Sequence, residues 1–560
     1  MAGLLCAAAV ASLAGCGSSH KATSADDPSR LTPASAALYA GAVVRPEGEL
    51  KSAAQAAGQA LTHQADPYTR LLELLRTPGS PPLDYASEVA PWLGPQAATF
   101  ATSLQGASAL VAPLEQLLLG ASPTTGAFPF SANGLQGAIL LSTTDAGKAG
   151  AFLHTRARLA GAHATSYRGV AFEANSGGVA FGLVDDFAVI GSLAGMQGVI
   201  DTSLGDPALA HSASYERLLS VAPSSALAHV YSNPSALVGG ASSGPSAPAG
   251  LLAVLAGARA VNVSLVPSAS SIALDADALT QAKAAPAAGG LLESSAQGAQ
   301  ALDELPGDSW LAIGLGNVGP SLTGDVRGLT AALGALGGGS GESQGISIKG
   351  LLEGIIAPLK VLGGQGNEAR RAYQSWMGSA GIFASGTGLV ELRAAVTINS
   401  NDPALSRAAV AKVGEALEAK GGSVGPTSIP GTDAAIQVRV PGLPVELAIA
   451  NGKAANGQTK FVIGLAEASV TAALRPASTL SSAATRSNAS AMLGEGIQPS
   501  VIINFQTLLS LLEGFGLNED PAISRFLPLM RASTTLAGGA KQLDGEVQRL
   551  RLVLGLAPAG

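Results

Sequence analysis

The pattern of apolar and polar residues in the first half of the chain predicts short strands separated by amphipathic helices. Strands are expected over residues 31–39 and 138–142. Helices are expected over 49–61 and up to Arg158, because apolar residues recur there at steps of three and four. Residues 179–191 alternate in the way of two strands joined by a tight turn, which predicts a β-hairpin.

The second half of the chain shows the same order of patterns. A strand over 305–313 is followed by a helix over 325–336, and a strand over 394–398 is followed by a helix up to Ala419. A second hairpin is expected over 445–464. The order strand, helix, strand, helix, hairpin is therefore expected twice.

A tryptophan followed two residues later by a glycine occurs in each half, at Trp92 and at Trp376. Tyr85 precedes the first of them and Tyr373 precedes the second. An indole beside a glycine can stack on a ligand, so both tryptophans are candidate ligand-binding residues. Large aromatic side chains more often anchor a core, and their occurrence in both halves favours that structural role.

This repetition predicts an α+β protein with two similar lobes that arose by internal duplication. Lobe one is expected over residues 31–290 and lobe two over 300–560. Each lobe should hold a mainly antiparallel sheet that is built from hairpins and covered by packed helices. The competing explanation is chance similarity between alanine-rich segments.

The N-terminus carries the pattern of a bacterial lipoprotein signal. An apolar run over 4–13 ends in Leu13-Ala14-Gly15-Cys16, and both cysteines of the chain lie within these first sixteen residues. Residues 1–15 are thus expected to be a cleaved signal peptide, although basic residues are missing before the apolar run and we expect a start codon upstream. Cys16 is expected to carry the lipid, and residues 16–30 to form a flexible tether on the extracytoplasmic side of the cell membrane.

Composition and charge narrow the function classes. The 560 residues include only 13% charged side chains and have a mean hydropathy of +0.33, yet no apolar run after the signal reaches the length of a membrane-spanning helix. The net charge is −7 and no cluster of basic residues occurs, which argues against nucleic acid as a partner. A single lipidated cysteine leaves no internal disulfide in the mature chain.

Three short segments resemble a known bacterial family, domain of unknown function 3352. They are Pro33 with its strand, the segment Pro91-Trp92-Leu93-Gly94, and the hairpin strand over 187–191. The resemblance implies an exported or membrane-tethered envelope protein and supplies no catalytic residues. In the second half Met377 and Ser375 replace the Leu and Pro of this pattern, so that copy fits it less well.

Two glycine-rich motifs suggest enzyme chemistry and are better explained otherwise. Residues 314–319 match a dinucleotide-binding fingerprint, but Pro320 follows at once and the expected acidic residue is missing, so a turn at the end of a strand is favoured. Residues 240–244 match a nucleophile elbow around Ser242, but they lie in a loop rich in Gly, Ser and Pro. No cofactor is expected.

The acidic residues and histidines give no predicted catalytic or metal centre. Asp185-Asp186 and Asn451-Gly452 are expected to form hairpin turns. Asp275 and Asp277 alternate with apolar residues and are expected at exposed strand positions. The six histidines show no helical ligand spacing, and none lies beyond His229.

The sequence therefore predicts a lipid-anchored envelope protein without catalytic activity, which acts by binding or as a scaffold. Its expected partners are the membrane, through Cys16, and either another envelope protein or an apolar ligand. Two alternatives remain open at this point. One is a carrier of an apolar or lipid-like ligand, and the other is a hydrolase with a site near Ser242, Ser309 or Asp308.

Overall fold

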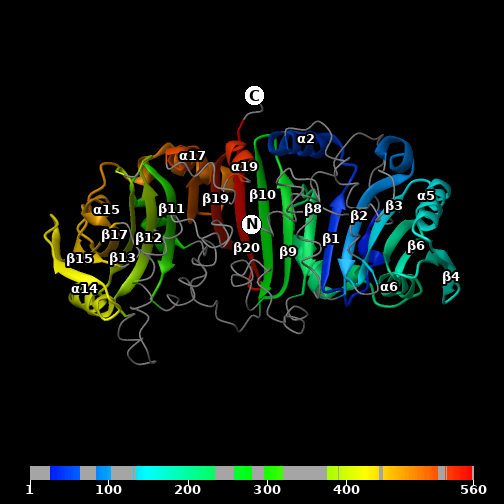
Figure 1. Ribbon diagram of the computed structural model, residues 1–560, viewed down its shortest axis with the longest axis horizontal. Helices are drawn as coiled ribbons and strands as arrows, with labels where there is room; N and C mark the ends of the chain where they lie inside the picture. Colours follow the sequence, from blue (N-terminus) through cyan, green and yellow to red (C-terminus); the bar gives the residue numbers. More distant parts are fainter. Residues whose placement is uncertain are drawn as a thin grey trace.

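The computed structural model describes residues 26–62, 84–102, 130–131, 134–233, 258–280, 295–319, 358, 375–388, 390–440, 445–514, 524 and 526–557. Within these residues, twenty strands form one sheet. The sheet extends along the long axis of the molecule, as Figure 1 shows. The structure is thus a mixed α+β fold with a large antiparallel sheet.

The first half contributes ten strands and most of its helices lie between them. The strands are β1 (Leu38–Val43), β2 (Leu93–Ala101), β3 (Gly137–Thr143), β4 (His163–Tyr167), β5 (Val170–Ala174), β6 (Val179–Val184), β7 (Phe187–Ser192), β8 (Ala228–Ser232), β9 (Ala258–Pro267) and β10 (Ser271–Thr280). The helices are α2 (Gly48–Thr62), α5 (Ala146–Leu159), α6 (Leu193–Ser203) and α7 (Ala213–Val221), with short turns η2 (Pro28–Arg30), η4 (Tyr85–Val89) and η5 (Leu209–His211).

The second half contributes the other ten strands. They are β11 (Ser309–Asn317), β12 (Met377–Ser385), β13 (Arg393–Ser400), β14 (Ser423–Pro426), β15 (Thr432–Arg439), β16 (Leu447–Lys453), β17 (Thr459–Leu465), β18 (Val501–Asn504), β19 (Ser533–Gln542) and β20 (Val547–Leu556). The helical elements are α10 (Ala296–Asp303), α14 (Pro403–Glu418), α15 (Ala466–Leu474), η6 (Leu480–Ser482), α16 (Ala484–Leu493), α17 (Phe505–Gly514) and α19 (Leu527–Arg531).

Every pairing between these strands is antiparallel, and the order of pairing is the same in both halves. The first half runs β4-β5-β6-β7-β3-β2-β1-β8-β9-β10. The second half runs β14-β15-β16-β17-β13-β12-β11-β18-β19-β20. The two orders meet where β10 pairs with β20 near the middle of the molecule (Figure 1). Strands β4 and β14 therefore lie at the two ends of the sheet.

The helices begin where polar capping residues follow the strands. Asp145 caps α5 by accepting a hydrogen bond from the backbone N–H of Lys148, at 3.0 Å. Asp402 caps α14 in the same way, through the N–H groups of Ala404 and Leu405. A carboxylate at this position satisfies backbone donors that the helix itself leaves without a partner. Both helices predicted at these places are confirmed.

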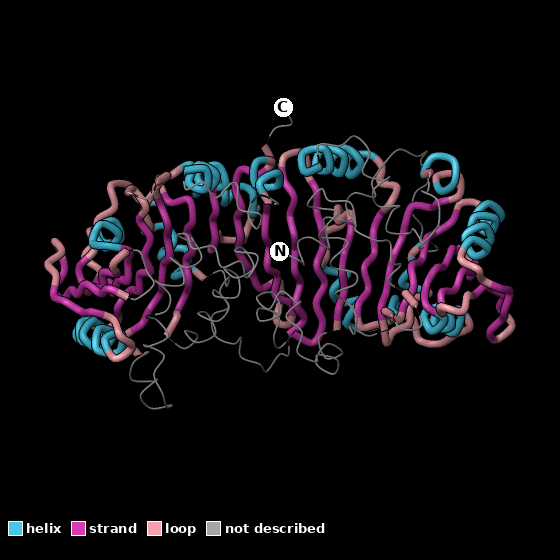
Figure 2. Tube along the Cα trace, viewed as in Figure 1, coloured by secondary structure: helices cyan, strands magenta, loops and turns pink. Residues whose placement is uncertain are grey.

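The core consists of the apolar residues that the strands and helices turn toward each other. All residues of β7 are buried, as expected for a strand covered on both faces. Helices lie along the sheet at many of the strand ends, as Figure 2 shows in cyan. Within the described ranges, no helix is both long and apolar enough to cross a membrane.

The structure corrects two of the predicted turns. Asn451 and Gly452 lie within β16, and the turn to β17 falls after Lys453; the amide of Asn451 instead donates to Asp433 on β15 at 2.8 Å. Gly314 lies inside β11 and not at its end. A Cβ there would lie 2.2 Å from the carbonyl oxygen of Gly298, so this glycine allows α10 to approach the strand closely.

The N-terminal boundary also differs from the expectation. Residues 28–30 form η2, and the side chain of Ser29 is buried. Pro28 and Ser29 of the expected tether are therefore buried against the folded part of the chain. Cys16, the loop around Ser242 and the helix expected over 325–336 lie outside the described residues.

Candidate functional site

Four charged residues meet where the two halves join. Asp275 and Asp277 on β10 pair in register with Arg551 and Arg549 on β20. Both carboxylates are 0% exposed, so the prediction of exposed strand positions is wrong. The reason is that β20 lies beside β10 and supplies a cation opposite each acid, which allows burial of groups that otherwise stay in water.

Each arginine forms a two-pronged ion pair with its aspartate. Arg549 donates to both carboxylate oxygens of Asp277, at 2.7 and 2.8 Å. Arg551 donates to both oxygens of Asp275, at 2.6 Å each. Paired hydrogen bonds of this kind fix geometry as well as charge.

The arginines also bind the ends of two helices. Arg549 donates to the carbonyl oxygen of Val221, the last residue of α7, at 2.6 Å. Arg551 donates to that of Leu493, the last residue of α16, at 3.1 Å. Burial raises the pKa of Asp277, while the charge and hydrogen bonds of Asp277 raise the pKa of Arg549 against the effect of burial. Since these groups pair with one another and both carboxylates are fully buried, the cluster holds the two halves together and is closed to a substrate.

Beside this cluster, the first half holds a group of aromatic rings around His229. The hydroxyl of Tyr215 lies 3.1 Å from Nε2 of His229, and the rings of Tyr39 and Tyr231 pack edge-on against Tyr215. Burial lowers the pKa of His229 to about 4 and raises the pKa of Tyr215. At neutral pH the imidazole is therefore neutral and the phenol protonated, which suits a structural contact.

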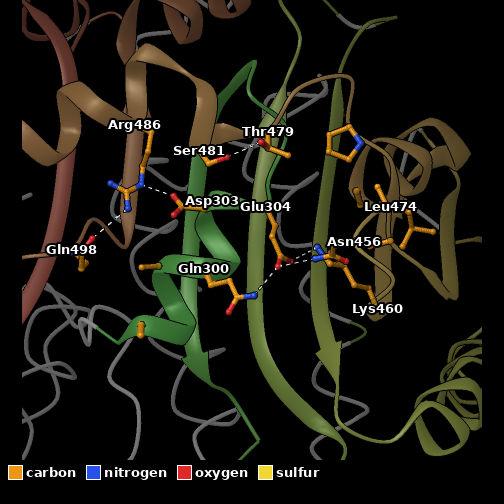
Figure 3. A pocket seen from close by; sticks show the side chains of 16 residues that line it. Gln300, Asp303, Glu304, Asn456, Lys460, Leu474, Thr479, Ser481, Arg486 and Gln498 are labelled. Carbon is orange, nitrogen blue, oxygen red and sulfur yellow. Dashed lines mark hydrogen bonds and ion pairs between the residues drawn. The ribbon is translucent and has the colours of Figure 1, made fainter.

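The second half holds a hollow of about 600 Å³ between helix ends and a hairpin turn. It is bounded by α10, the β16–β17 turn, the end of α15, η6 and the start of α16 (Figure 3). Part of its wall is formed by small apolar residues: Ala296, Ala299, Ala454, Ala455, Ala473, Leu474 and Pro476.

One side of the hollow carries a buried ion pair. The side chain of Lys460 is only 4% exposed and its Nζ lies 2.7 Å from Oε2 of Glu304. The other carboxylate oxygen of Glu304 accepts hydrogen bonds from the amides of Gln300 and Asn456, at 3.2 and 3.1 Å. These side chains converge from α10 and from the β16–β17 hairpin (Figure 3).

A second ion pair lies on the other side of the hollow. The Nε of Arg486 lies 2.6 Å from Oδ1 of Asp303, and its Nη2 donates to Oε1 of Gln498 at 3.4 Å. Thr479 and Ser481 share a hydrogen bond at the rim, at 2.8 Å. The hollow is thus lined by two acids, two bases and neutral polar groups together with small apolar side chains.

The structure places the two candidate tryptophans away from this hollow. Trp92 and Trp376 are each 1% exposed and belong to the hydrophobic core. The indole of Trp92 donates to the carbonyl oxygen of Glu88 at 2.7 Å and packs near Phe152. Neither residue lines the hollow.

The remaining candidate residues are found at separate places. Asp185 has a positive φ of 49° between β6 and β7, as the predicted turn requires. Ser309 donates to the carbonyl oxygen of Pro306 at 2.6 Å. His154 lies 3.0 Å from Glu173. Within the described ranges, no group of three or more His, Cys, Asp or Glu side chains could hold a metal ion.

Sequence reasoning missed both the hollow and the central cluster. The one signal for the cluster was the spacing of charge: acids at 275 and 277 and bases at 549 and 551 each lie on one face of a strand. Glu304 directly follows Asp303 and Lys460 stands alone among uncharged residues, and nothing near either of them in the sequence indicates the other.

Comparison with known proteins identifies the family. The model of a family described as "Protein of unknown function (DUF3352)" matches residues 23–330, which is more than half of the chain. No curated protein matches. A solved structure, crystal form I of TP0453, is similar over 45% of this chain and 78% of its own, with 10% identical residues and a TM-score of 0.24, which is too low to carry an argument.

Proposed function

The chain belongs to the DUF3352 family of proteins of unknown function, and we propose that it is a lipid-anchored binding protein of the bacterial cell envelope without catalytic activity. Its lipid would be attached at Cys16, and its folded part would lie on the extracytoplasmic side of the membrane. The observation that carries the binding role is the hollow of the second half, with its buried ion pair between Glu304 and Lys460.

The charged groups of the hollow favour binding over catalysis. Lys460 is held by Glu304, and Arg486 is held by Asp303 and Gln498. A general base or a nucleophile needs an activated group within reach of the substrate. Acids and bases that neutralise each other instead present fixed charges to a ligand, which is what recognition requires.

We further propose that the two halves are products of an internal duplication, with lobe one ending near residue 290 and lobe two beginning near 300. The shared order of strand pairing supports this proposal. So do small details: Pro33 bridges Ala208 as Pro306 bridges Thr479. Ser192 accepts from the backbone of Gly137 as Ser469 accepts from that of Ala394, each at 3.1 Å.

The two tryptophans also make matching backbone contacts in the two halves. The carbonyl oxygen of Trp92 accepts from the N–H of Thr144, and that of Trp376 accepts from the N–H of Asn401, at 2.7 Å in both cases. Each contact ties the start of one strand to the end of its neighbour. This supports the view that both tryptophans serve the fold.

The anchor is tested by changing Cys16 to Ala in the native host and following the protein in membrane and soluble fractions. The variant should leave the membrane fraction, because the thiol that takes the lipid is gone. Cys6→Ala is the matched control, since Cys6 lies inside the expected signal peptide and should not affect attachment. Full membrane retention of the Cys16 variant would overturn the anchor.

The binding role is tested by native mass spectrometry of a soluble form that begins at Ser18, purified from its host without detergent. A reproducible bound mass that disappears on mild unfolding would support a binding protein. A clean mass of the chain alone, at every salt concentration tried, would count against a tightly held ligand.

A further inference from the structure

We propose that the hollow of the second half binds short peptides with free ends, and that the carboxylate lies at Arg486 on one side of the hollow while the ammonium group lies at Glu304 on the other. This inference rests on the proposed binding function and names its ligand class. It follows from a comparison of the hollow with the corresponding place in the first half, and from the charges that line it.

Two β-bridges occupy the same place in the two halves. Since Pro33 bridges Ala208 and Pro306 bridges Thr479, Pro33 corresponds to Pro306. Two residues earlier in each half, Leu31 corresponds to Glu304. A buried apolar side chain of the first half is therefore replaced by a carboxylate.

The register of the sheet identifies the partner of this carboxylate. Phe187 of β7 pairs with Ser142 of β3, four positions before Gly191 pairs with Ala138. In the second half, Lys460 of β17 pairs with Asn399 of β13, four positions before Gly464 pairs with Ala395. Lys460 therefore corresponds to Phe187.

The first half thus holds an apolar pair where the second half holds an ion pair. Leu31 and Phe187 are 3% and 2% exposed and belong to one hydrophobic cluster. Burying an ion pair in place of well-packed apolar side chains brings no gain in stability as a rule, because both charges must leave water. The pair of Glu304 and Lys460 differs from the buried pairs between β10 and β20 because it lines a hollow that a ligand can enter.

A third replacement lies at the same hollow. Ala208 corresponds to Thr479 through the bridges, so Tyr215, seven residues on, corresponds to Arg486. Tyr215 belongs to the aromatic group around His229, whereas Arg486 lines the hollow. All three changes introduce charge, and all three lie at one place.

The balance of charge selects the class of ligand. A ligand with only negative charge would meet the two carboxylates, and one with only positive charge would meet Lys460 and Arg486. A molecule with one carboxylate and one ammonium group satisfies both kinds of lining residue. The hollow remains neutral when such a molecule enters.

The neutral lining residues point to a peptide among such molecules. The amides of Gln300 and Asn456 can donate to and accept from peptide groups. The apolar part of the wall is mainly alanine, so it offers no aromatic surface for stacking on a sugar or a base. A volume of about 600 Å³ lies within the range of small-molecule sites.

The test is isothermal titration calorimetry on the full-length mature protein with three probes: trialanine, N-acetyl-trialanine and trialanine amide. We expect trialanine to bind, and each blocked peptide to bind about tenfold more weakly or worse, because each lacks one charge. Equal affinity for the three probes, or no binding of trialanine at millimolar concentration, would overturn the proposal.

A double variant locates the site. Glu304→Leu combined with Lys460→Phe installs the pair that the first half already uses, so the fold should be kept while trialanine binding is lost. The control is Lys453→Met, which removes an exposed lysine from the neighbouring strand β16 and should leave binding unchanged. Undiminished binding by a folded double variant would also refute the site.

The outcome is separable from that of the proposed function. If trialanine fails to bind but a native bound mass is found on the protein from its host, the binding function stands and the peptide class is wrong. If neither is found, both proposals fail.

Discussion

The ion pair of Asp277 and Arg549 should be one of the most sensitive points of the fold. Asp277→Ala removes both carboxylate oxygens and leaves the guanidinium of Arg549 with the carbonyl oxygen of Val221 and, at 3.6 Å, the carboxylate of Asp275, which already pairs with Arg551. Breaking a buried pair in this way costs about 3–5 kcal/mol. That is a large share of the roughly 5–15 kcal/mol that stabilises a typical domain.

A second result is expected when both members of the pair of Asp277 and Arg549 are replaced. Asp277→Leu combined with Arg549→Met removes both charges and fills the space with apolar atoms. Because the desolvation of two charges is then avoided, the double variant should be close to neutral, or more stable than the single variant by several kcal/mol. An exposed pair serves as the control: Arg168→Ala breaks the contact with Asp201 and should cost about 1 kcal/mol or less.

The assay is urea unfolding at pH 7, followed by far-UV circular dichroism, with the free energy of unfolding taken from the midpoint and slope of the transition. A loss below about 1 kcal/mol for Asp277→Ala would refute the reasoning, because two guanidinium groups would then share the single buried carboxylate of Asp275 at almost no cost in stability. A double variant as unstable as the single one would show that the geometry of the pair, and not its charge, holds β10 to β20.

Three further outcomes can be measured. Burial lowers the pKa of His229 to about 4, so the unfolded state binds more protons than the folded state between pH 6.5 and 4. The free energy of unfolding should therefore decrease as the pH is lowered from about 6.5 to about 4, by up to about 3 kcal/mol. His229→Gln should remove this contribution, as urea unfolding at several pH values would show. Gly314→Ala should cost about 1–3 kcal/mol through its contact with Gly298, whereas Gly425→Ala, which meets nothing within 4 Å, should be harmless in thermal unfolding. The Glu304→Leu, Lys460→Phe variant should lose trialanine binding but keep its fold. Its melting temperature, measured by circular dichroism, should stay within a few degrees of that of the unchanged protein.

Local signals carried most of what could be predicted about the secondary structure. Asp145 and Asp402 each precede an amphipathic stretch, and both helices begin there because a side-chain cap acts over two or three residues. The hairpin of β6 and β7 was equally visible, since its alternation and its turn lie within fifteen residues or so. The family resemblance, which rested on Pro33 and the segment around Trp92, is confirmed.

Contacts between distant parts of the chain could not be predicted in this way. Asp277 and Arg549 are 272 residues apart, and the burial of one depends on the position of the other. The period-two pattern of β10 correctly gave a strand but could not say which face meets solvent, because both faces are covered here. The turn at Asn451-Gly452 failed for a related reason: two residues that favour turns can also lie in a strand when a neighbour such as Asp433 binds the side chain.

Under the proposed binding function, the first half supplies a closed core and the second half supplies the site. At corresponding places the first half has Leu31, Phe187 and Tyr215, which pack into a closed core, and the second half has Glu304, Lys460 and Arg486, which line a hollow. A single domain that exchanged three core residues for charges would lose burial that it needs. Here the loss is shared, because β10 and β20 join both halves into one sheet through nine residue pairs and two buried ion pairs. Weakening that joint by Asp277→Ala should therefore lower the free energy of unfolding of the second half as well, while trialanine binding by the folded protein should stay unchanged, because Asp277 lies outside the hollow.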